Sequence, residues 1–364
     1  MIRNVPEKWD LEADLVSVGS GGGGLSAAIT AVDHGISALI LERSDQVGGV
    51  TAYSMGEVWI PGNHLAQQLG IEDSEESGYR YVQQLSMGYG EDVSILNQAI
   101  HGPVALKYFE DSIDLKMTVI RNLPDYYYPY NDDGLAEGRY LEAEPFPAAT
   151  LGEWQSKTRV SPHVPYSLTH EDIFSGGGMA NMAGWDYNVM AERLTKDLRC
   201  AGPGLAAYFV KGVLDREIPI HINMNVEELI GDGQRIVGVR ATQDGKDVYV
   251  KANRAVVIAV SSYERNASYA KTLGHQLNVE SMVMPAVDGA HLRLAGQVGA
   301  RIARVPDVTL LGFHVPGEEQ ENGVPLWRGA LPFLGLPHTI VVNKAGKRFA
   351  NEGFYRSIYY ATDA

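Results

Sequence analysis

A glycine-rich turn near the start of the chain restricts its fold more than any other feature of the sequence. Residues 14–18 form a short apolar run typical of a buried strand, and residues 19–24 read Gly-Ser-Gly-Gly-Gly-Gly. Residues 25–33 are rich in small side chains and indicate a helix. A second apolar run, residues 37–41, leads directly to Glu42. This order predicts the strand, turn, helix and strand of an α/β fold.

The pattern G-x-G-x-x-G in this turn is typical of a dinucleotide site. Gly19 permits a tight turn, Gly21 lets the backbone approach a pyrophosphate, and Gly24 lets helix and strand pack closely. The N-terminus of the helix offers free N–H groups to the phosphates. Glu42, 18 residues after Gly24, can accept both hydroxyls of an adenosine ribose. A glycine-rich loop without a ligand is the alternative.

The segment after Glu42 favours FAD over NAD. A second glycine pair, Gly48 and Gly49, is followed by small and hydroxyl-bearing residues and then by Val-Trp-Ile-Pro at residues 58–61. An NAD domain would usually continue with a further strand and helix. Small residues and hydroxyls suit a chain that lies flat along an isoalloxazine ring. The alternative is an ordinary glycine turn before a strand.

Composition restricts the class of protein further. The chain has 364 residues, 45% of them hydrophobic, which allows two or three domains with sizeable cores. The 45 acidic and 30 basic residues give a net charge of −15, which disfavours nucleic acid as a partner. One cysteine and ten dispersed histidines predict neither a disulfide framework nor a metal site. From the N-terminal residues we expect no signal peptide, and we expect a soluble, cytoplasmic protein without a transmembrane segment.

The segment after Glu42 also resembles the flavin-contact segment of the fumarate reductase/succinate dehydrogenase flavoprotein superfamily. The matching residues are Gly48, Gly49, Thr51, Ala52, Ser54 and Gly56. The Trp-Ile-Pro at 59–61 is similar to the 3-ketosteroid dehydrogenase branch, which usually has Gly where this chain has Met55. Respiratory members attach the flavin through a His before the Thr, and this chain has Val50 there. The resemblance therefore implies noncovalent FAD.

Tyrosines in the middle of the chain are candidates for catalysis. Asp-Tyr-Tyr at residues 125–127 and Gly-Arg-x-Leu-Glu-x-x-Pro-Phe at residues 138–146 are similar to the 3-ketosteroid dehydrogenases. In that family the Tyr after the Asp lies beside the substrate, which implies this role for Tyr126, with Tyr127 as the alternative. From the residues alone, a loop packed by aromatic faces is the competing interpretation.

The second half of the chain carries further strand signals. Residues 226–254 indicate an antiparallel set with Asp-Gly turns, and residues 255–260 indicate a fully buried strand after it. This order resembles the second half of a glutathione-reductase-like FAD domain, where the backbone near Val226 meets the adenine. Residues 150–185 are interpreted as loop, and residues 197–217 as a helix that is broken near Gly-Pro-Gly.

The last part of the chain resembles the family's capping domain. Asp288 begins a helix start similar to the family's Gly-Asp-Gly, and residues 340–352 form a hairpin similar to its V-N-x-x-G-x-R-F-x-N-E motif. In ketosteroid dehydrogenases a Tyr at the offset of Tyr355 lies in the active site. In fumarate-type reductases an Arg at the offset of Arg356 donates the proton. From the residues alone, a packed Tyr355 and an Arg356 ion pair on a helix surface are the alternatives.

The expected fold class is α/β. A glutathione-reductase-like Rossmann FAD-binding domain, with a parallel sheet and a β-meander, spans residues 1–288 and includes a helical and loop excursion at about 64–200. Residues 289–364 begin an α+β capping domain that is incomplete. Family members continue beyond the position of Ala364, so we expect a further segment or a second subunit to complete the flavin site.

The resemblance implies an FAD-dependent oxidoreductase that acts on a CH–CH group next to a carbonyl, with hydride passed to flavin N5. The substrate would be a small hydrophobic ketone or enone, as in 3-ketosteroid dehydrogenation, and the sequence does not specify the electron acceptor. A fumarate-type enoate reductase, or a catalytically incomplete flavin-binding fragment, is the alternative. The predicted catalytic residues are Tyr126, Tyr355 and Arg356. The predicted cofactor-binding residues are Gly19, Ser20, Gly21, Gly23, Gly24, Glu42, Arg43, Gly48, Gly49, Thr51, Ala52, Ser54, Val226, Ala259 and Asp288.

Overall fold

The structure of the chain is a computed structural model that describes residues 5–128, 130–273, 280–302, 311–330, 333–334 and 336–352. The chain divides into two compact units. The first comprises Met1–Asp172, Asp186–Val260 and His291–Val305, and the second comprises Ile173–Trp185, Ser261–Ala290 and Pro306–Ala364. The expected division of the chain at residue 288 stays a prediction.

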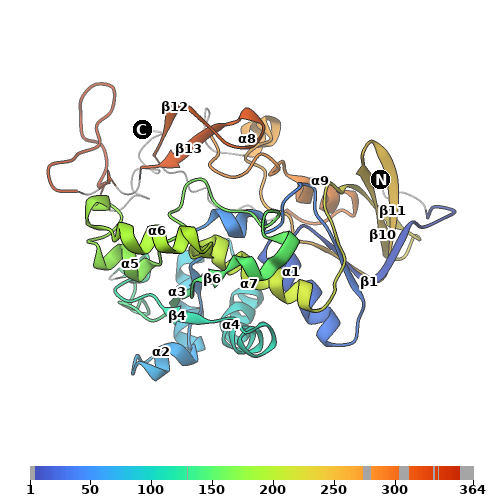
Figure 1. Cartoon of the computed structure of the whole chain (residues 1–364), viewed down its shortest axis with the longest axis horizontal. Helices are drawn as coiled ribbons and strands as arrows, with labels where there is room; N and C mark the ends of the chain where they lie inside the picture. The colour runs from blue at the N-terminus through green and yellow to red at the C-terminus, as the bar shows by residue number, and fades with distance from the viewer. Residues whose placement is uncertain are drawn as a thin grey trace. The chain divides into compact units, whose positions relative to one another are not determined.

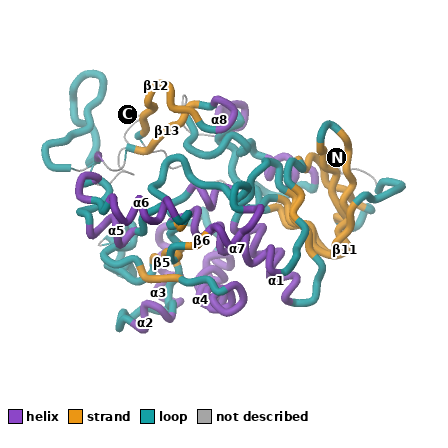
Figure 2. The backbone as a smooth tube through the Cα atoms, viewed as in Figure 1, coloured by secondary structure: helices purple, strands orange, loops and turns teal. Residues whose placement is uncertain are grey.

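The first unit contains a six-stranded sheet (Figures 1 and 2). Its strands are β1 (Leu11–Val18), β2 (Ala38–Leu41), β8 (Ile220–His221), β9 (Asn225–Gly231), β10 (Ile236–Gln243) and β11 (Lys246–Ile258). They lie in the order β8-β2-β1-β11-β10-β9. The first four are parallel, and β11, β10 and β9 form the antiparallel set that the Asp-Gly turns predict. The fold is therefore mixed α/β with parallel strands, as expected.

The separate, fully buried strand expected at residues 255–260 is wrong. β11 continues without a break to Ile258; Ala255 is exposed, and the three residues after it are half-buried. β10 pairs with β11 only as far as Lys251, so the described ladder beyond that residue pairs β11 with β1 alone. The apolar run at 255–258 thus lies in a strand end that has a neighbour on one side.

Helices α1 (Gly22–Asp33) and α7 (Ala201–Asp215) pack on each other and on one face of the sheet. Alternate residues of β2 enter two apolar clusters, because side chains along a strand point to opposite faces. Ala38 and Ile40 join the cluster of α1 and α7, whereas Leu39 and Leu41 join a cluster with Leu294 of α9 (Ala290–Gln297). Burial on both faces is typical of parallel strands.

Helix α7 is continuous from Ala201 to Asp215, so the expected break near Gly-Pro-Gly is wrong. The expected start at residue 197 is wrong as well, because Leu198–Arg199 form strand β7. Pro203 lies in the first turn of the helix, where a backbone N–H has no partner within the helix. The flanking glycines serve close packing. A Cβ on Gly202 would lie 2.2 Å from the carbonyl oxygen of Thr51, and one on Gly204 would lie 2.3 Å from that of Arg199. The N-terminus of α7 therefore lies directly against the predicted flavin-contact segment.

The excursion of the first unit combines helices with loop, as expected. It contains α2 (His64–Gln68), α3 (Glu75–Ser86), α4 (Asp92–Ile113) and α6 (Tyr187–Thr195). A small antiparallel sheet in the order β3-β5-β4 connects this region to the flavin-contact segment. Its strands are β3 (Val58–Trp59), β4 (Met117–Val119) and β5 (Tyr140–Ala143), and a further pair is β6 (Phe146–Pro147) with β7 (Leu198–Arg199).

The interpretation of residues 150–185 as loop missed helix α5 (His170–Ser175). Thr169 precedes the helix, and its hydroxyl accepts a hydrogen bond from the backbone N–H of Asp172 at 3.2 Å. The Asp172 carboxylate accepts from the Thr169 N–H at 2.8 Å in return. This reciprocal pair is a capping box, so the Thr-x-x-Asp spacing carried the signal.

The second unit contains helix α8 (Ala267–Leu273) and the antiparallel pair β12 (Gly312–Glu319) and β13 (Pro325–Gly329). The hairpin expected at residues 340–352 is present as one bridge between Val342 and Arg348. Its turn is closed by a 2.9 Å hydrogen bond from the Asn343 N–H to the Lys347 carbonyl.

Candidate cofactor and active site

The glycine turn lies at the carboxyl end of β1, the edge where open α/β sheets bind ligands. Gly19 has φ +101°, and a Cβ there would lie 2.6 Å from the carbonyl oxygen of Ala259. A Cβ on Gly24 would lie 2.0 Å from the Gly19 carbonyl oxygen. On Gly21 it would meet only the Thr51 hydroxyl, at 3.8 Å. The turn is thus closed on its inner side and open at Gly21, which fits the approach of a phosphate group.

The second glycine pair is joined to the first turn by hydrogen bonds. The Gly48 N–H donates to the Ser20 carbonyl at 3.0 Å, and the Gly22 N–H donates to the Thr51 hydroxyl at 2.9 Å. Gly48 has φ +108°, and a Cβ on Gly49 would lie 2.9 Å from the Gly21 Cα. The two turns therefore form one continuous backbone surface.

Glu42 lies against this surface and is 5% exposed. Its Oε2 accepts hydrogen bonds from the Ser20 N–H at 3.0 Å and the Ser20 hydroxyl at 2.5 Å. Its Oε1 accepts from the Ser44 N–H at 2.8 Å and the Ser44 hydroxyl at 2.9 Å. Ser44 was missed by the sequence reasoning, although a hydroxyl residue two positions after an acid is well placed for such local bonds.

Other predicted cofactor residues lie near the same turn. The Ala259 N–H donates to the Val18 carbonyl at 2.9 Å, just before Gly19. The Met224 N–H donates to the Glu42 carbonyl at 2.8 Å, and Val226 is buried in β9 two residues later.

The remaining predicted residues differ in their surroundings. Ala52 is fully buried, and the Ser54 hydroxyl donates to the Thr51 carbonyl at 2.8 Å. Arg43 is exposed beside Glu42, and Gly23 is exposed on the turn. Asp288 belongs to the second unit.

A cation that the sequence reasoning missed lies beside the same surface. Arg159 is 1% exposed, and its Nη2 donates to the Ser44 hydroxyl at 3.1 Å. Its backbone N–H donates to the Val47 carbonyl at 2.9 Å, directly before Gly48. No local motif marks Arg159, because it is distant in sequence from both glycine turns.

Tyr126 lies in the first unit at a separate place. Its ring is 41% exposed and lies 5.6 Å from the ring of Tyr140 on β5. Tyr140 pairs with Trp59 of β3. Trp59 lies three residues after Gly56, the last residue of the flavin-contact segment. Tyr355 and Arg356 lie outside the described residues.

A buried histidine connects the same strands and was also missed. His170 is 5% exposed; its Nδ1 lies 2.8 Å from Glu142 Oε2 of β5, and its Nε2 lies 2.9 Å from Glu57 Oε1. Burial opposes the charged imidazole, but its hydrogen bonds to the Glu142 and Glu57 carboxylates outweigh burial and raise the pKa of His170 to about 9. This histidine is therefore a cation at neutral pH that bridges two carboxylates.

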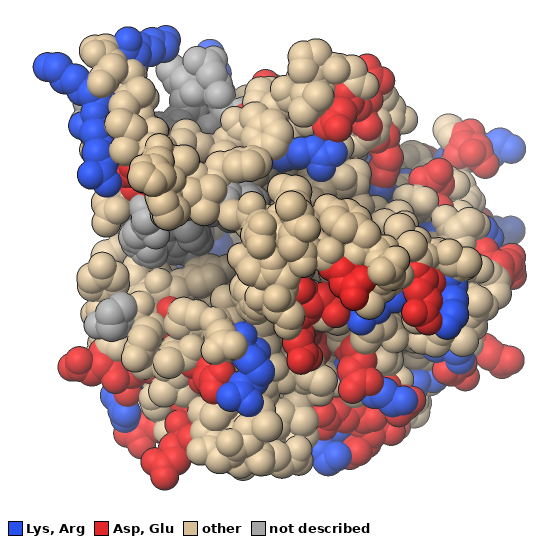
Figure 3. All heavy atoms as spheres, turned by 60° about the vertical axis from the view of Figure 1, so that its left-hand side comes forward, with Lys and Arg blue, Asp and Glu red and all other residues tan. Residues whose placement is uncertain are grey.

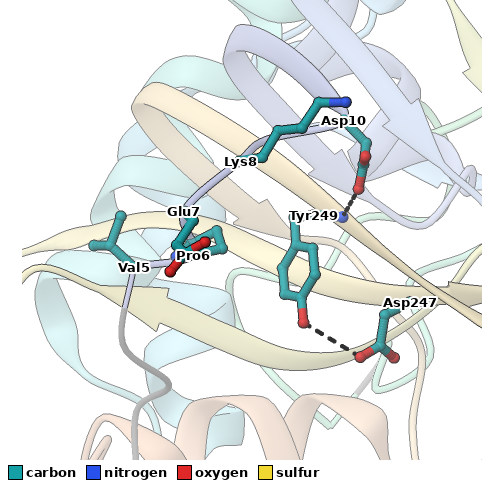
Figure 4. A pocket seen from close by; sticks show the side chains of 7 residues that line it. All are labelled: Val5, Pro6, Glu7, Lys8, Asp10, Asp247 and Tyr249. Carbon is teal, nitrogen blue, oxygen red and sulfur yellow. Dashed lines mark hydrogen bonds between the residues drawn. The ribbon is translucent and has the colours of Figure 1, made fainter.

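A surface pocket of about 740 Å³ lies elsewhere in the first unit (Figure 4). Its lining residues are Val5, Pro6, Glu7, Lys8, Asp10, Asp247 and Tyr249. The Tyr249 N–H donates to the Asp10 carboxylate at 2.9 Å, directly before the N-terminal end of β1. The glycine turn follows the other end of β1, so this pocket is separate from the candidate site.

Comparison with known proteins identifies the family. Residues 14–361 match the FAD binding domain family, and the chain belongs to it. Its cofactor is FAD, which agrees with the open Gly21 turn and with the buried acid beside it.

Two curated relatives of the chain are named as dehydrogenases. The chain is 28% identical over 348 residues to 4-oxocyclohexanecarboxylate 2-dehydrogenase of Sinomonas cyclohexanicum, covering 93% of this chain and 58% of the relative. It is 27% identical over 360 residues to 3-oxosteroid 1-dehydrogenase of Mycolicibacterium smegmatis, covering 94% and 62%. The chain therefore spans about three fifths of the length of these relatives.

Solved structures agree with this relationship. The crystal structure of 3-ketosteroid delta1-dehydrogenase from Sterolibacterium denitrificans has a TM-score of 0.83 and 27% identity, covering 96% of this chain and 65% of that chain. A flavocytochrome c3 fumarate reductase has a TM-score of 0.64 at 16% identity, which shows a shared fold. Among the helices of the described residues, none is both long and apolar enough to cross a membrane.

Proposed function

We propose that this protein is an FAD-dependent dehydrogenase that removes two hydrogens from adjacent carbons next to a ketone. The observation that carries the proposal is the continuous backbone surface of the two glycine turns, open at Gly21, in a chain whose relatives are named as oxosteroid and oxocyclohexane dehydrogenases. We propose a cyclic ketone, such as a 3-ketosteroid, as the substrate class. When bound, FAD supplies an acceptor for the hydride at flavin N5.

The proposed Rossmann domain would bind FAD without a covalent bond. The N-terminus of α1 and the turn at Gly21 would receive the pyrophosphate, because their N–H groups and open space suit an anion. Glu42 would accept ribose hydroxyls, either beside its bonds to Ser44 or in place of them. Val50 stands where respiratory relatives carry their attachment histidine, which supports the noncovalent form.

Tyrosines would handle the proton and orient the ketone. A phenol can relay a proton and hydrogen-bond a carbonyl while its ring packs against an apolar substrate. Tyr126 is 41% exposed and its ring is tilted against that of Tyr140, which supports this role, and we propose Tyr355 as the second phenol. A hydrogen bond to the ketone oxygen would stabilise the enolate that forms when the α-proton leaves.

A fumarate-type reductase is the second candidate. The position of Arg356 four residues after Glu352 favours it, since a cationic Arg near a substrate carboxylate could donate the proton. Trp59 and Tyr126 favour the dehydrogenase.

The setting of the enzyme is part of the proposal. We propose a cytoplasmic protein whose flavin site is completed by an α+β cap, through a further segment or a second subunit. Both acidic and basic side chains lie on the face shown in Figure 3, and the net charge of −15 disfavours a polyanionic ligand. The electron acceptor is not specified by any described feature.

A spectroscopic experiment tests the proposed function. FAD-loaded protein is mixed anaerobically with a saturated 3-ketosteroid or a 4-oxocyclohexanecarboxylate, and the visible absorbance of the oxidised flavin is followed by stopped flow. The expected result is bleaching by the ketone. Reoxidation of chemically reduced protein by fumarate, without bleaching by either ketone, would replace the dehydrogenase with the reductase.

A further inference from the structure

Asp125, the residue directly before Tyr126, is held by donors from three parts of the first unit. Its carboxylate is 2% exposed. Oδ1 accepts a hydrogen bond from the Trp59 indole at 2.7 Å. Oδ2 accepts from the Leu135 N–H at 2.9 Å and from Arg139 Nη1 at 2.8 Å. Three converging donors leave this side chain little freedom to rotate.

Arg139 extends this arrangement. Its side chain is fully buried and forms a two-point ion pair with Asp73, with Nη2 2.7 Å from Oδ1 and Nε 3.0 Å from Oδ2. The guanidinium lies 5.4 Å from the ring centroid of Trp59 and 5.5 Å from that of Tyr81. A buried cation with two carboxylates and two aromatic faces is a rigid support, because any displacement would leave a charge unpaired in the interior.

The backbone on both sides of Tyr126 is fixed as well. The Asp125 N–H donates to the Leu135 carbonyl at 2.9 Å, and the Tyr127 N–H donates to the Tyr81 hydroxyl at 3.1 Å. The Tyr126 side chain between them is 41% exposed. Its anchor is therefore rigid while its phenol can reach a ligand.

Trp59 connects this anchor to the flavin-contact segment. It lies three residues after Gly56, and it pairs across β3 and β5 with Tyr140, whose ring contacts Tyr126. We infer that Trp59 and Asp125 are positioning residues that set the place of the Tyr126 phenol relative to the flavin-contact segment. The inference rests on the proposed function. It adds that Trp59 and Asp125 hold the Tyr126 phenol in position relative to the cofactor.

The Trp59→Phe variant tests the inference with a small change. It keeps an aromatic ring beside Arg139 and removes the indole N–H that binds Asp125. The matched control is Trp185→Phe, which removes an indole hydrogen bond of 3.1 Å to the Gly178 carbonyl within the second unit and leaves the Asp125 bonds intact. Both variants are compared as FAD-loaded protein, alone and combined with Tyr126→Phe.

The expected kinetic result is non-additivity. Trp59→Phe should lower the rate of flavin reduction by the ketone on the order of tenfold, because small misplacements of a reacting group are costly, with FAD affinity and KM changed less than about twofold. In the Tyr126→Phe background the same substitution should cost nothing further. If the two losses multiply, Trp59 acts on the fold alone and the inference is wrong, while the dehydrogenase stands. A Tyr126→Phe variant with the parent rate would also overturn it.

A readout without turnover separates this inference from the proposed function. Protein labelled with 3-fluorotyrosine gives a ¹⁹F resonance for Tyr126, assigned by its loss in Tyr126→Phe. The resonance should shift or broaden in Trp59→Phe and stay in place in Trp185→Phe. If no ketone or enone reduces or reoxidises the flavin, the proposed function fails, and an unchanged Tyr126 resonance in Trp59→Phe overturns the positioning inference independently.

Discussion

At the scale of single residues, the glycines of the first turn differ in what requires them. The packing of the protein requires glycine at positions 19 and 24, since a Cβ at either position would collide with backbone atoms. Gly21 has φ −73° and ψ 176°, an extended conformation that any residue adopts, and its Cβ position is open. Of these three glycines, Gly21 alone can therefore be replaced without strain in the protein, which makes it the better probe of the cofactor.

We expect Gly21→Val to fold and to lose FAD. A branched side chain would fill the space through which a pyrophosphate approaches the turn. The predicted loss of FAD affinity is on the order of a hundredfold or more, about 3 kcal/mol. Calorimetric titration with FAD measures it. The matched control is Gly296→Val, an exposed helix position with nothing within 4 Å of its Cβ; equal affinities in the two variants would contradict the proposed site.

Substitutions at Tyr355 and Arg356 distinguish the two candidate reactions. Proton-transfer groups typically contribute 10²–10⁴-fold, so Tyr355→Phe should slow flavin reduction by a ketone on the order of a hundredfold with FAD still bound. The rate should rise toward alkaline pH, because a free phenol has a pKa of ~10. Stopped-flow flavin reduction across pH gives both results. A Tyr355→Phe variant at the parent rate, beside an inactive Arg356→Ala, would favour the reductase.

At the scale of elements, His170 joins segments that the sequence separates widely. Glu57 follows the flavin-contact segment, Glu142 lies on β5, and His170 begins α5. Both ring nitrogens face carboxylates, so the protonated imidazole donates to each and holds the three elements together. The backbone N–H of His170 donates a third hydrogen bond, its second to Glu142, at 2.8 Å.

The raised pKa of His170 predicts how the free energy of unfolding depends on pH. Its pKa in the folded protein, about 9, exceeds the value of ~6.5 expected in the unfolded chain. The contribution is therefore fully present below about pH 6.5 and is lost as the pH rises through 9, with an upper limit of about 3 kcal/mol. Urea unfolding of parent and His170→Gln measures it: the difference between them should shrink from pH 6 to pH 9.5. The exposed His101→Gln is the control, and a difference independent of pH would contradict the prediction.

At the scale of the whole molecule, the candidate cofactor surface is assembled from distant parts of the first unit. Residues 19–24, Glu42, residues 48–54 and Ala259 meet at the carboxyl end of the parallel strands. A ligand that contacts all of these segments binds the folded chain and not the unfolded chain. Its binding free energy must therefore add to the free energy of unfolding.

We expect FAD to stabilise the protein and NAD to leave it unchanged. At a free FAD concentration 100 times Kd, the gain in the free energy of unfolding is about 2.7 kcal/mol. Thermal melts of flavin-depleted protein with each nucleotide measure the shift.

Acid precipitation of the FAD-loaded protein should release all the flavin into the supernatant, because Val50 offers no attachment histidine. Flavin that stays with the precipitate would contradict the noncovalent form.

Much of this arrangement could be predicted because its signals are local. The apolar runs, the glycine spacing and Glu42 lie within one stretch of sequence, and the Asp-Gly turns predict the meander. Errors arose where a local signal had two interpretations. Pro203 reads as a helix breaker until its place in the first turn of α7 is known, and residues 255–258 read as a buried strand until their neighbours are known.

The sequence by itself determined the order of the first strand, helix and second strand, the antiparallel set after residue 226, the dinucleotide turn and the family, since spacing and residue type encode them. Only the tertiary structure decided which distant groups meet. It placed Thr51 on the N-terminus of α1, joined Trp59 to Asp125, and set His170 between two carboxylates. The physical reason is that such contacts depend on strand pairing and packing between segments up to 113 residues apart, and no local periodicity or propensity records that pairing.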